Sequence, residues 1–201
     1  MPRPSSLSNP RFAEFAAVLA AHPEWFKPWS GTFFRFQTTD FPGAKDILSG
    51  EGAKRRGGRW NLPGIAALYG STTDTTALEE SKANDRYYGI QTKSPRLLVA
   101  IEARLERVVD LTAPEVRRTL HYTLKASASE DWRKVQQAGG ESDSQALGRA
   151  IATAGADGLL ARSSAVWAGV NVIVFPGART RDRLSVVEGE KLARLIKTPP
   201  P

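Results

Sequence analysis

The chain has 201 residues, of which 24% are charged and 41% hydrophobic, the ordinary composition of a globular domain. It contains no cysteine, which excludes a disulfide framework, a thiolate nucleophile and a cysteine-based zinc site. The formal net charge of +7 favours an acidic partner: a nucleotide, a nucleic acid, an anionic surface or an acidic protein. No apolar run approaches about 18 residues and the N-terminus lacks the apolar core of a signal peptide, so we expect a cytoplasmic protein.

The N-terminal part of the chain predicts a helix, a strand and a loop. Asn9 and Pro10 are typical of a helix start, and the apolar face that follows predicts a helix over residues 11–21. Residues 31–37 alternate as in a strand, with Phe34 and Phe36 on one face and Arg35 on the other. Residues 40–64, rich in glycine, proline and charge, predict a long functional loop.

The rest of the chain predicts short strands mixed with helices. The helices begin at Asp74 or a neighbouring threonine, at Pro114, and at Ser142 or Asp143, whereas residues 125–141 are polar and lack a clear pattern. The predicted strands cover residues 66–70, 96–101, 107–111, 158–161, 170–175 and 184–187. Their spacing is too irregular for a doubly wound sheet, and no GxGxxG motif is present, so we predict an α+β fold.

Three polar residues stand in recognisable local contexts. Arg35 lies in Gly-Thr-Phe-Phe-Arg-Phe, and Glu80 closes a segment that contains Gly-Gly-Arg-Trp-Asn. Ser163 lies between an Asp-Gly-Leu-Leu run and Asn171. In this order and over residues 31–175, the set resembles the RES domain family, which is named after these three residue types.

The resemblance implies a fold and a biological setting. The fold would be related to the ADP-ribosyltransferases: split mixed sheets around a NAD cleft, with flanking helices. Residues 1–30 would be an N-terminal helical extension, 31–190 the RES domain and 191–201 a tail. Family members are NAD-consuming toxins, usually encoded beside an Xre-type antitoxin, so NAD is expected as substrate and no cofactor is expected.

Cleavage of the nicotinamide–ribose bond requires particular side chains. Arginine meets phosphate oxygens with a planar fork of donors, and a carboxylate stabilises the positive charge that develops on the ribose. An aromatic ring can hold the reacting ribose and nicotinamide in place. The resemblance assigns Arg35 and Arg59 to binding NAD, Tyr69 to packing on nicotinamide, and Glu80 to the developing cation.

Ser163 is expected to hydrogen-bond ribose or nicotinamide, and Asn171 to bind NAD or orient the serine loop. Each assignment has a structural alternative, such as a strand arginine in an ion pair, a glutamate favoured by the helix dipole or a turn asparagine. Glu79 and Ser164 compete with their neighbours for the two motif positions. With two histidines and no cysteine, no dedicated metal site is expected.

The acceptor of the ADP-ribosyl group stays open: water, phosphate or a protein side chain. The basic run Lys54–Arg56 with Arg59 offers more charge than one diphosphate needs, so inorganic phosphate is a candidate second anion. Two alternatives are a protein ADP-ribosyltransferase with the same site and a non-enzymatic basic module that binds nucleic acid. Expected partners are NAD and an Xre-type antitoxin or an immunity protein; no membrane is expected, and nucleic acid only through the antitoxin.

Overall fold

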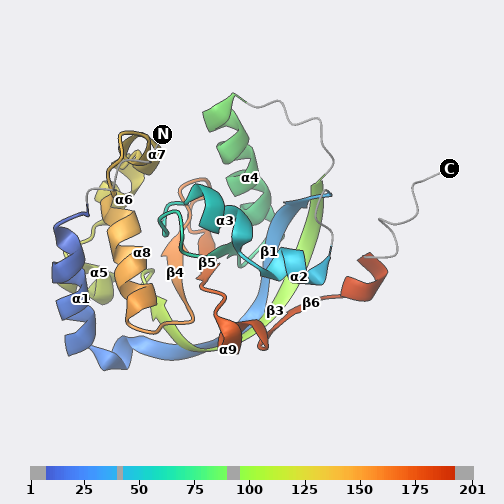
Figure 1. The fold of residues 1–201 in the computed structure, drawn as a ribbon, viewed down its shortest axis with the longest axis horizontal. Helices are drawn as coiled ribbons and strands as arrows, with labels where there is room; N and C mark the ends of the chain where they lie inside the picture. The colour runs from blue at the N-terminus through green and yellow to red at the C-terminus, as the bar shows by residue number, and fades with distance from the viewer. Residues whose placement is uncertain (1–7, 40–42, 90–95, 193–201) are drawn as a thin grey trace.

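The computed structural model describes residues 8–39, 43–89 and 96–192, and within them six strands form one mixed sheet (Figure 1). The strands are β1 (Phe26–Thr38), β2 (Leu68–Ser71), β3 (Arg96–Asp110), β4 (Gly158–Arg162), β5 (Val170–Val174) and β6 (Leu184–Val186). Their order is β1-β2-β5-β4-β3-β6, and β1 also pairs with β3. The first five strands therefore close into a barrel, to which β6 adds an edge.

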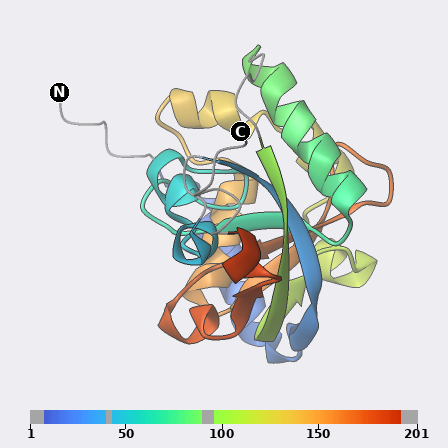
Figure 2. The same ribbon diagram turned by 90° about the vertical axis from the view of Figure 1, so that its right-hand side faces the viewer.

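The pairing of β1 with β3 is what closes the barrel. It runs antiparallel from Phe26 opposite Val109 to Thr38 opposite Arg96, and Figure 2 shows the two long strands side by side. The α+β class is confirmed, but the expected division into two separate sheets is wrong. β3 continues through the residues between the two strands predicted over 96–101 and 107–111, so its two ends belong to one sheet.

Helices cover the outside of the barrel. The α-helices are α1 (Arg11–Ala21), α2 (Ala44–Leu48), α3 (Glu51–Arg56), α4 (Asp74–Tyr88), α5 (Pro114–Thr119), α6 (Leu124–Ser129), α7 (Trp132–Gln137), α8 (Asp143–Thr153) and α9 (Ala178–Arg181), with a 3₁₀ turn, η1 (Pro23–Trp25). α1 packs on α8 at one side of the molecule, and α4 packs on β1 at another (Figure 1). None of the helices in the described ranges is long and apolar enough to cross a bilayer.

The alternation of side chains along the strands separates two apolar cores. Val172 and Val174 of β5 point into the barrel, where they join Phe33 in an inner core. Ile173 points outward and joins an outer core under α1 and α8, which includes Phe15. Because full burial of a large apolar side chain stabilises a fold by about 1.5–3 kcal/mol, α1 is part of the domain's packing although it falls in the predicted extension.

Two segments carry more structure than their composition predicts. The segment expected as a loop over residues 40–64 contains α2 and α3, and the polar stretch 125–141 contains α7 and most of α6. Short helices of this kind lack a long apolar periodicity and owe their stability to tertiary contacts. Residues 40–42 and the predicted tail beyond residue 192 lie outside the described residues.

Candidate active site

Glu80 occupies α4, which follows directly on β2. Thr73 caps the helix by accepting a hydrogen bond from the backbone N–H of Thr76, as the sequence predicts for a neighbour of Asp74. The helix packs on β1, β2 and β5, and this packing turns its inner face toward the ends of β4 and β5. The half-buried carboxylate of Glu80 is thereby brought to residues far away in the sequence.

The Glu80 carboxylate is held through one of its two oxygens. Oε1 accepts a hydrogen bond from Ser163 Oγ and another from Asn171 Nδ2, both at 2.7 Å. Asn171 is itself oriented by Ser71, whose hydroxyl donates to Asn171 Oδ1 at 2.8 Å. The other oxygen, Oε2, receives no hydrogen bond from any residue that the structure describes. A fixed carboxylate with one free oxygen is suited to stabilise a cation placed beside it.

Ser163 is fixed by its own loop as well as by Glu80. Its hydroxyl oxygen accepts hydrogen bonds from the backbone N–H groups of Ala165 and Val166, both at 3.0 Å, while its N–H donates to Gly169 O. The single hydroxyl proton is directed at Glu80. The structure therefore gives Ser163 a partner in the protein, whereas a hydrogen bond to substrate remains a prediction.

Glu79 has a different environment from Glu80. Its carboxylate pairs with Lys82 at 2.7 Å, and this hydrogen bond lowers the pKa of Glu79. Adjacent helical residues point about 100° apart, so the two glutamates cannot share a site. The bonds from Ser163 and Asn171 select Glu80 as the glutamate of this cluster.

Tyr69 fastens the Gly-Gly-Arg-Trp loop to β2. Its hydroxyl donates to Asn61 Oδ1 at 2.7 Å and accepts from the backbone N–H of Trp60 at 2.9 Å. Burial raises the pKa of Tyr69, so the hydroxyl stays protonated as this network requires. Trp60 is buried in the outer core and serves as a packing anchor.

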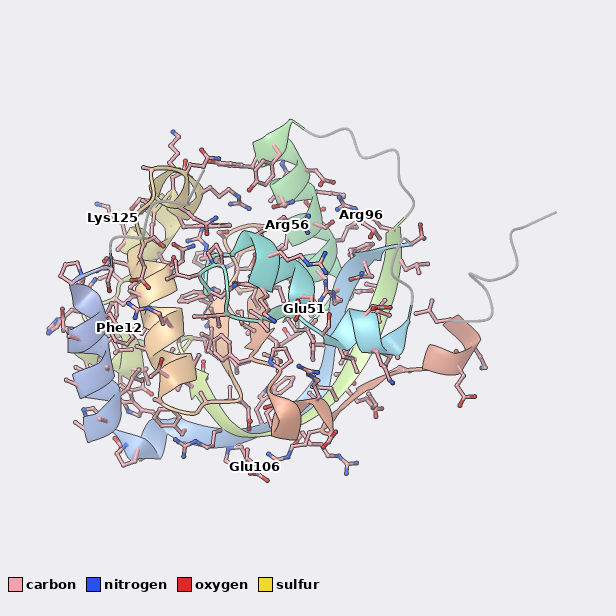
Figure 3. The ribbon with its side chains drawn as sticks, viewed as in Figure 1. Phe12, Glu51, Arg56, Arg96, Glu106 and Lys125 are labelled. Carbon is pink, nitrogen blue, oxygen red and sulfur yellow. The ribbon has the colours of Figure 1, made fainter. Side chains whose placement is uncertain are left out.

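Arg59 extends from the same loop toward α6. Its Nη1 donates to the carbonyl oxygen of Ser127 at 2.6 Å. The three basic residues before the loop are exposed on α3, and Lys54 pairs with Glu51 at 3.0 Å. Figure 3 shows Arg56 on α3, which lies at the front of that view. Among the side chains of the basic run, that of Arg59 is therefore the one hydrogen-bonded outside α3 to a described residue.

Glu80, Ser163, Asn171 and Ser71 form a hydrogen-bonded group, the Glu80 cluster. Arg35 makes no hydrogen bond to this cluster within the described residues. It lies opposite Val99 in the β1–β3 pairing, on the same side of β1 as Phe33 of the inner core. Ser71, by contrast, lies opposite Phe34, on the other side of the strand. The described residues thus place the predicted arginine and glutamate on opposite faces of the sheet.

The guanidinium of Arg35 is incompletely satisfied. Its Nε is buried and has no hydrogen-bond partner among the described residues, and burial lowers the pKa of Arg35 to about 10. An unpartnered buried cation opposes folding, because part of its hydration is lost without replacement. Such a residue is a candidate for ligand binding, where a bound anion would satisfy it.

Two residues of the site escaped the sequence analysis. Ser71 orients Asn171, and Asn61 links Tyr69 to three backbone carbonyls, those of Ala53, Leu62 and Ile65. Both are fully buried polar residues. Their positions beside recognised motif residues, after Tyr69-Gly and after Gly-Gly-Arg-Trp, were the signals available in the sequence.

Sequence comparison with known proteins identifies curated relatives. The NAD(+) phosphorylase MbcT of Mycobacterium tuberculosis and that of Mycobacterium bovis are each 30% identical to this chain over 118 residues. The aligned region is 55% of this chain and 60% of each relative, so the chain spans about three fifths of the length of the relatives that it matches.

A solved structure and a family model complete the comparison. The crystal structure of the Mycobacterium tuberculosis MbcT–MbcA toxin–antitoxin complex contains a chain with a similar fold, at a TM-score of 0.65 and 21% identity over 94% of this chain and 99% of that one. The RES domain model matches residues 32–194, which include all six residues predicted for the site. The chain belongs to the RES domain family.

Proposed function

We propose that this chain is a toxin that cleaves NAD at the bond between nicotinamide and ribose. The observation that carries the proposal is the Glu80 carboxylate, held at one oxygen by Ser163 and Asn171 and free of protein donors at the other among the described residues. Two hydrogen bonds would stabilise a structural glutamate as well, but only a carboxylate with a free oxygen can also face a developing cation. Family membership and the MbcT relatives support the same reaction.

The residues of the site divide the work of the reaction. As the bond between ribose C1′ and the nicotinamide nitrogen breaks, its electron pair leaves with nicotinamide, which departs as a neutral molecule. The ribose becomes oxocarbenium-like, and Glu80 Oε2 stabilises its positive charge. NAD would lie in an ADP-ribosyltransferase-like cleft beside this carboxylate, with nicotinamide against Tyr69 and the diphosphate at Arg59.

Inorganic phosphate is the acceptor that we propose. A phosphate oxygen forms the new bond to C1′, and the products are nicotinamide and a phosphorylated ADP-ribose. Support comes from the relatives, which are named NAD(+) phosphorylases, and from the net charge of +7. A chain with this excess of positive charge attracts phosphate as well as NAD.

An antitoxin is the expected protein partner of this chain. The structural neighbour comes from a toxin–antitoxin complex, and the fold similarity extends over 94% of this chain. We propose that an antitoxin of Xre type covers the site and that loss of NAD arrests growth when the antitoxin is absent.

The cellular part of the proposal is tested by induced expression with a matched variant. Cellular NAD should fall before growth stops when the native chain is induced, and both should be spared with Glu80→Gln, which keeps the shape of the side chain and removes its charge. Growth arrest with unchanged NAD would contradict the proposal. Equal amounts of folded protein in the two cultures, measured by immunoblotting of the soluble fraction, provide the control.

A further inference from the structure

A small pocket next to the predicted site contains cationic and polar groups that the reaction scheme does not use. It lies between α5, α6 and the end of β4, and its walls include Trp60, Arg117, Tyr122, Ser127, Ala161 and Arg162. Arg162 immediately precedes Ser163, which holds Glu80, and the carbonyl of Ser127 is the group that fixes Arg59. The pocket is therefore connected to Glu80 through Ser163 and to Arg59 through Ser127.

The Tyr122 hydroxyl is buried and makes no hydrogen bond of good geometry. The residue is 2% exposed and its Oη has no well-formed hydrogen bond to a described residue, although the hydroxyls of Ser127 and Ser144 lie near enough to act against the rise in its pKa. Burial raises the pKa of Tyr122 to about 12, so the hydroxyl keeps its proton and can donate it. A buried hydroxyl without a full hydrogen bond opposes folding, and a ligand with an oxygen acceptor would remove that cost.

The two arginines of the pocket are positioned by backbone carbonyls. Arg117 Nη1 donates to Leu111 O at 2.7 Å and Thr112 O at 2.6 Å, and Arg162 Nη1 donates to Ala168 O at 3.1 Å. These bonds hold each guanidinium while leaving its Nη2 group available. Within the described part of the chain, no carboxylate lies within ion-pair distance of either arginine.

The two cations are also close enough to affect each other. Burial, and after it the positive charge of Arg162, lowers the pKa of Arg117, against the opposing influence of Asp110 and Glu115. Like charges held together in this way favour the binding of an anion that neutralises both. Guanidinium groups and a tyrosine hydroxyl are all donors, and the ligand that accepts from several such donors at once is a phosphate group.

We propose that Arg117, Tyr122 and Arg162 form a binding site for a phosphate group, separate from the exposed basic run of α3. Inorganic phosphate and a phosphate of the dinucleotide share the chemistry that these residues recognise. The assignment of that phosphate to the NAD reaction rests on the proposed function, whereas the anion site itself rests on the pocket. Through Arg162 and Ala168, the bound anion would also support the loop that orients Ser163.

Direct binding tests the site without turnover. Inorganic phosphate is titrated into the full chain by calorimetry in the absence of NAD. Because a hydrogen bond to a charged group contributes about 1.5–3 kcal/mol, Arg162→Gln and Arg117→Gln should each weaken phosphate binding about tenfold or more. Tyr122→Phe should weaken it less and should leave the thermal unfolding midpoint unchanged or raised, because a buried hydroxyl without a full hydrogen bond is removed.

The matched control is Arg118→Gln, which removes the same charge from the exposed neighbour of Arg117. Its phosphate affinity should equal that of the native chain. Absence of phosphate binding, or equal weakening by Arg118→Gln and Arg162→Gln, would overturn the site. Equal weakening would mean that only net charge matters.

A second titration, with ADP-ribose, distinguishes the two sources of the phosphate. If the pocket binds inorganic phosphate, Arg162→Gln leaves ADP-ribose affinity unchanged and raises the phosphate concentration required for half-maximal nicotinamide release. If it binds a phosphate of the dinucleotide, Arg162→Gln weakens ADP-ribose binding and phosphate competes with ADP-ribose. A chain that binds phosphate at Arg162 but leaves NAD intact would contradict the proposed reaction and support the pocket.

Discussion

The hydroxyl of Ser163 lies 2.7 Å from Oε1 of Glu80, although the two residues are 83 positions apart in the sequence. The same hydroxyl oxygen accepts two backbone hydrogen bonds from its own loop, so its position is set independently of Glu80. Ser163 therefore acts on Glu80 as a positioning residue. Two of the three residues that define the family resemblance form one hydrogen-bonded unit.

Removal of this contact should lower the rate of nicotinamide release. Ser163→Ala is expected to reduce kcat about tenfold or more with a smaller change in KM for NAD, because the carboxylate loses one of its two donors. Ser164→Ala, at the exposed neighbouring position, should retain native activity. Steady-state kinetics of both variants checks this, and equal rates would remove Ser163 from the mechanism.

Replacement of the charged oxygen should have a larger effect than loss of its donor. Glu80→Gln should reduce nicotinamide release at least a hundredfold, as expected for a group that stabilises transition-state charge. Glu79→Gln provides the control, since Glu79 pairs with Lys82 and not with Ser163 or Asn171. An inactive Glu79→Gln beside an active Glu80→Gln would contradict the assignment of Glu80 as the glutamate of the site.

Arg35 should show opposite effects on stability and function. Arg35→Met retains the length of the side chain and removes a buried nitrogen that lacks a partner, so the free energy of unfolding should rise by about 1–3 kcal/mol. The family resemblance assigns Arg35 to binding NAD, so NAD consumption should be lost at the same time even though the residue lies on the other face of the sheet from Glu80. Chemical denaturation and nicotinamide release measure the two effects.

The control for this prediction is Arg104→Met, an exposed arginine on the neighbouring strand β3. Its free energy of unfolding should change by no more than about 0.5 kcal/mol, and its rate of NAD consumption should equal that of the native chain. Loss of stability in Arg35→Met, with activity retained, would identify Arg35 as a structural residue and remove it from the NAD site.

Tyr69 should contribute to stability through its hydroxyl. Tyr69→Phe leaves Asn61 Oδ1 and the backbone N–H of Trp60 without their partner, in a region where Asn61 is 0% exposed. The free energy of unfolding should fall by about 1–3 kcal/mol, and KM for NAD should rise because Arg59 loses its anchored loop. Tyr88→Phe, at a position 49% exposed, should leave both unchanged. Identical stability of Tyr69→Phe and the native chain would contradict this role.

A substitution at Gly58 tests the same loop, because it adds a Cβ atom where the wild-type residue has none. A Cβ at Gly58 would lie 2.5 Å from Tyr69 Oη and 2.8 Å from Asn61 Oδ1, so Gly58→Ala should displace the loop and lower both stability and NAD affinity. Gly177→Ala is the matched control, because a Cβ there meets no described atom within 4 Å. Native affinity for NAD in Gly58→Ala would indicate that the loop lies away from the substrate.

The sequence predicted the elements whose local signals were strong. Ser142 forms a capping box with Gln145, and the helix that follows begins where the sequence predicts. The alternation around Phe33 and Arg35 correctly separated the two faces of β1. In such segments the local pattern and the tertiary packing agree.

Long-range pairing was the part that the sequence did not predict. The closure of the sheet depends on the pairing of β1 with β3. Because α2, α3, β2 and α4 lie between these two strands in the sequence, no local pattern encodes that pairing. For the same reason, only the structure shows that Arg35 and Glu80 lie on opposite faces of the sheet. The hydrogen bonds of Ser71 and Asn61 likewise depend on partners brought together by folding.

The products formed from NAD test the central claim most directly. Purified chain is incubated with NAD in phosphate-free buffer and at increasing phosphate, and the products are separated by chromatography and identified by mass. We predict free nicotinamide together with a phosphorylated ADP-ribose, at a rate that rises with phosphate and is abolished in Glu80→Gln. NAD that stays intact at every phosphate concentration, with the protein folded, would contradict the account.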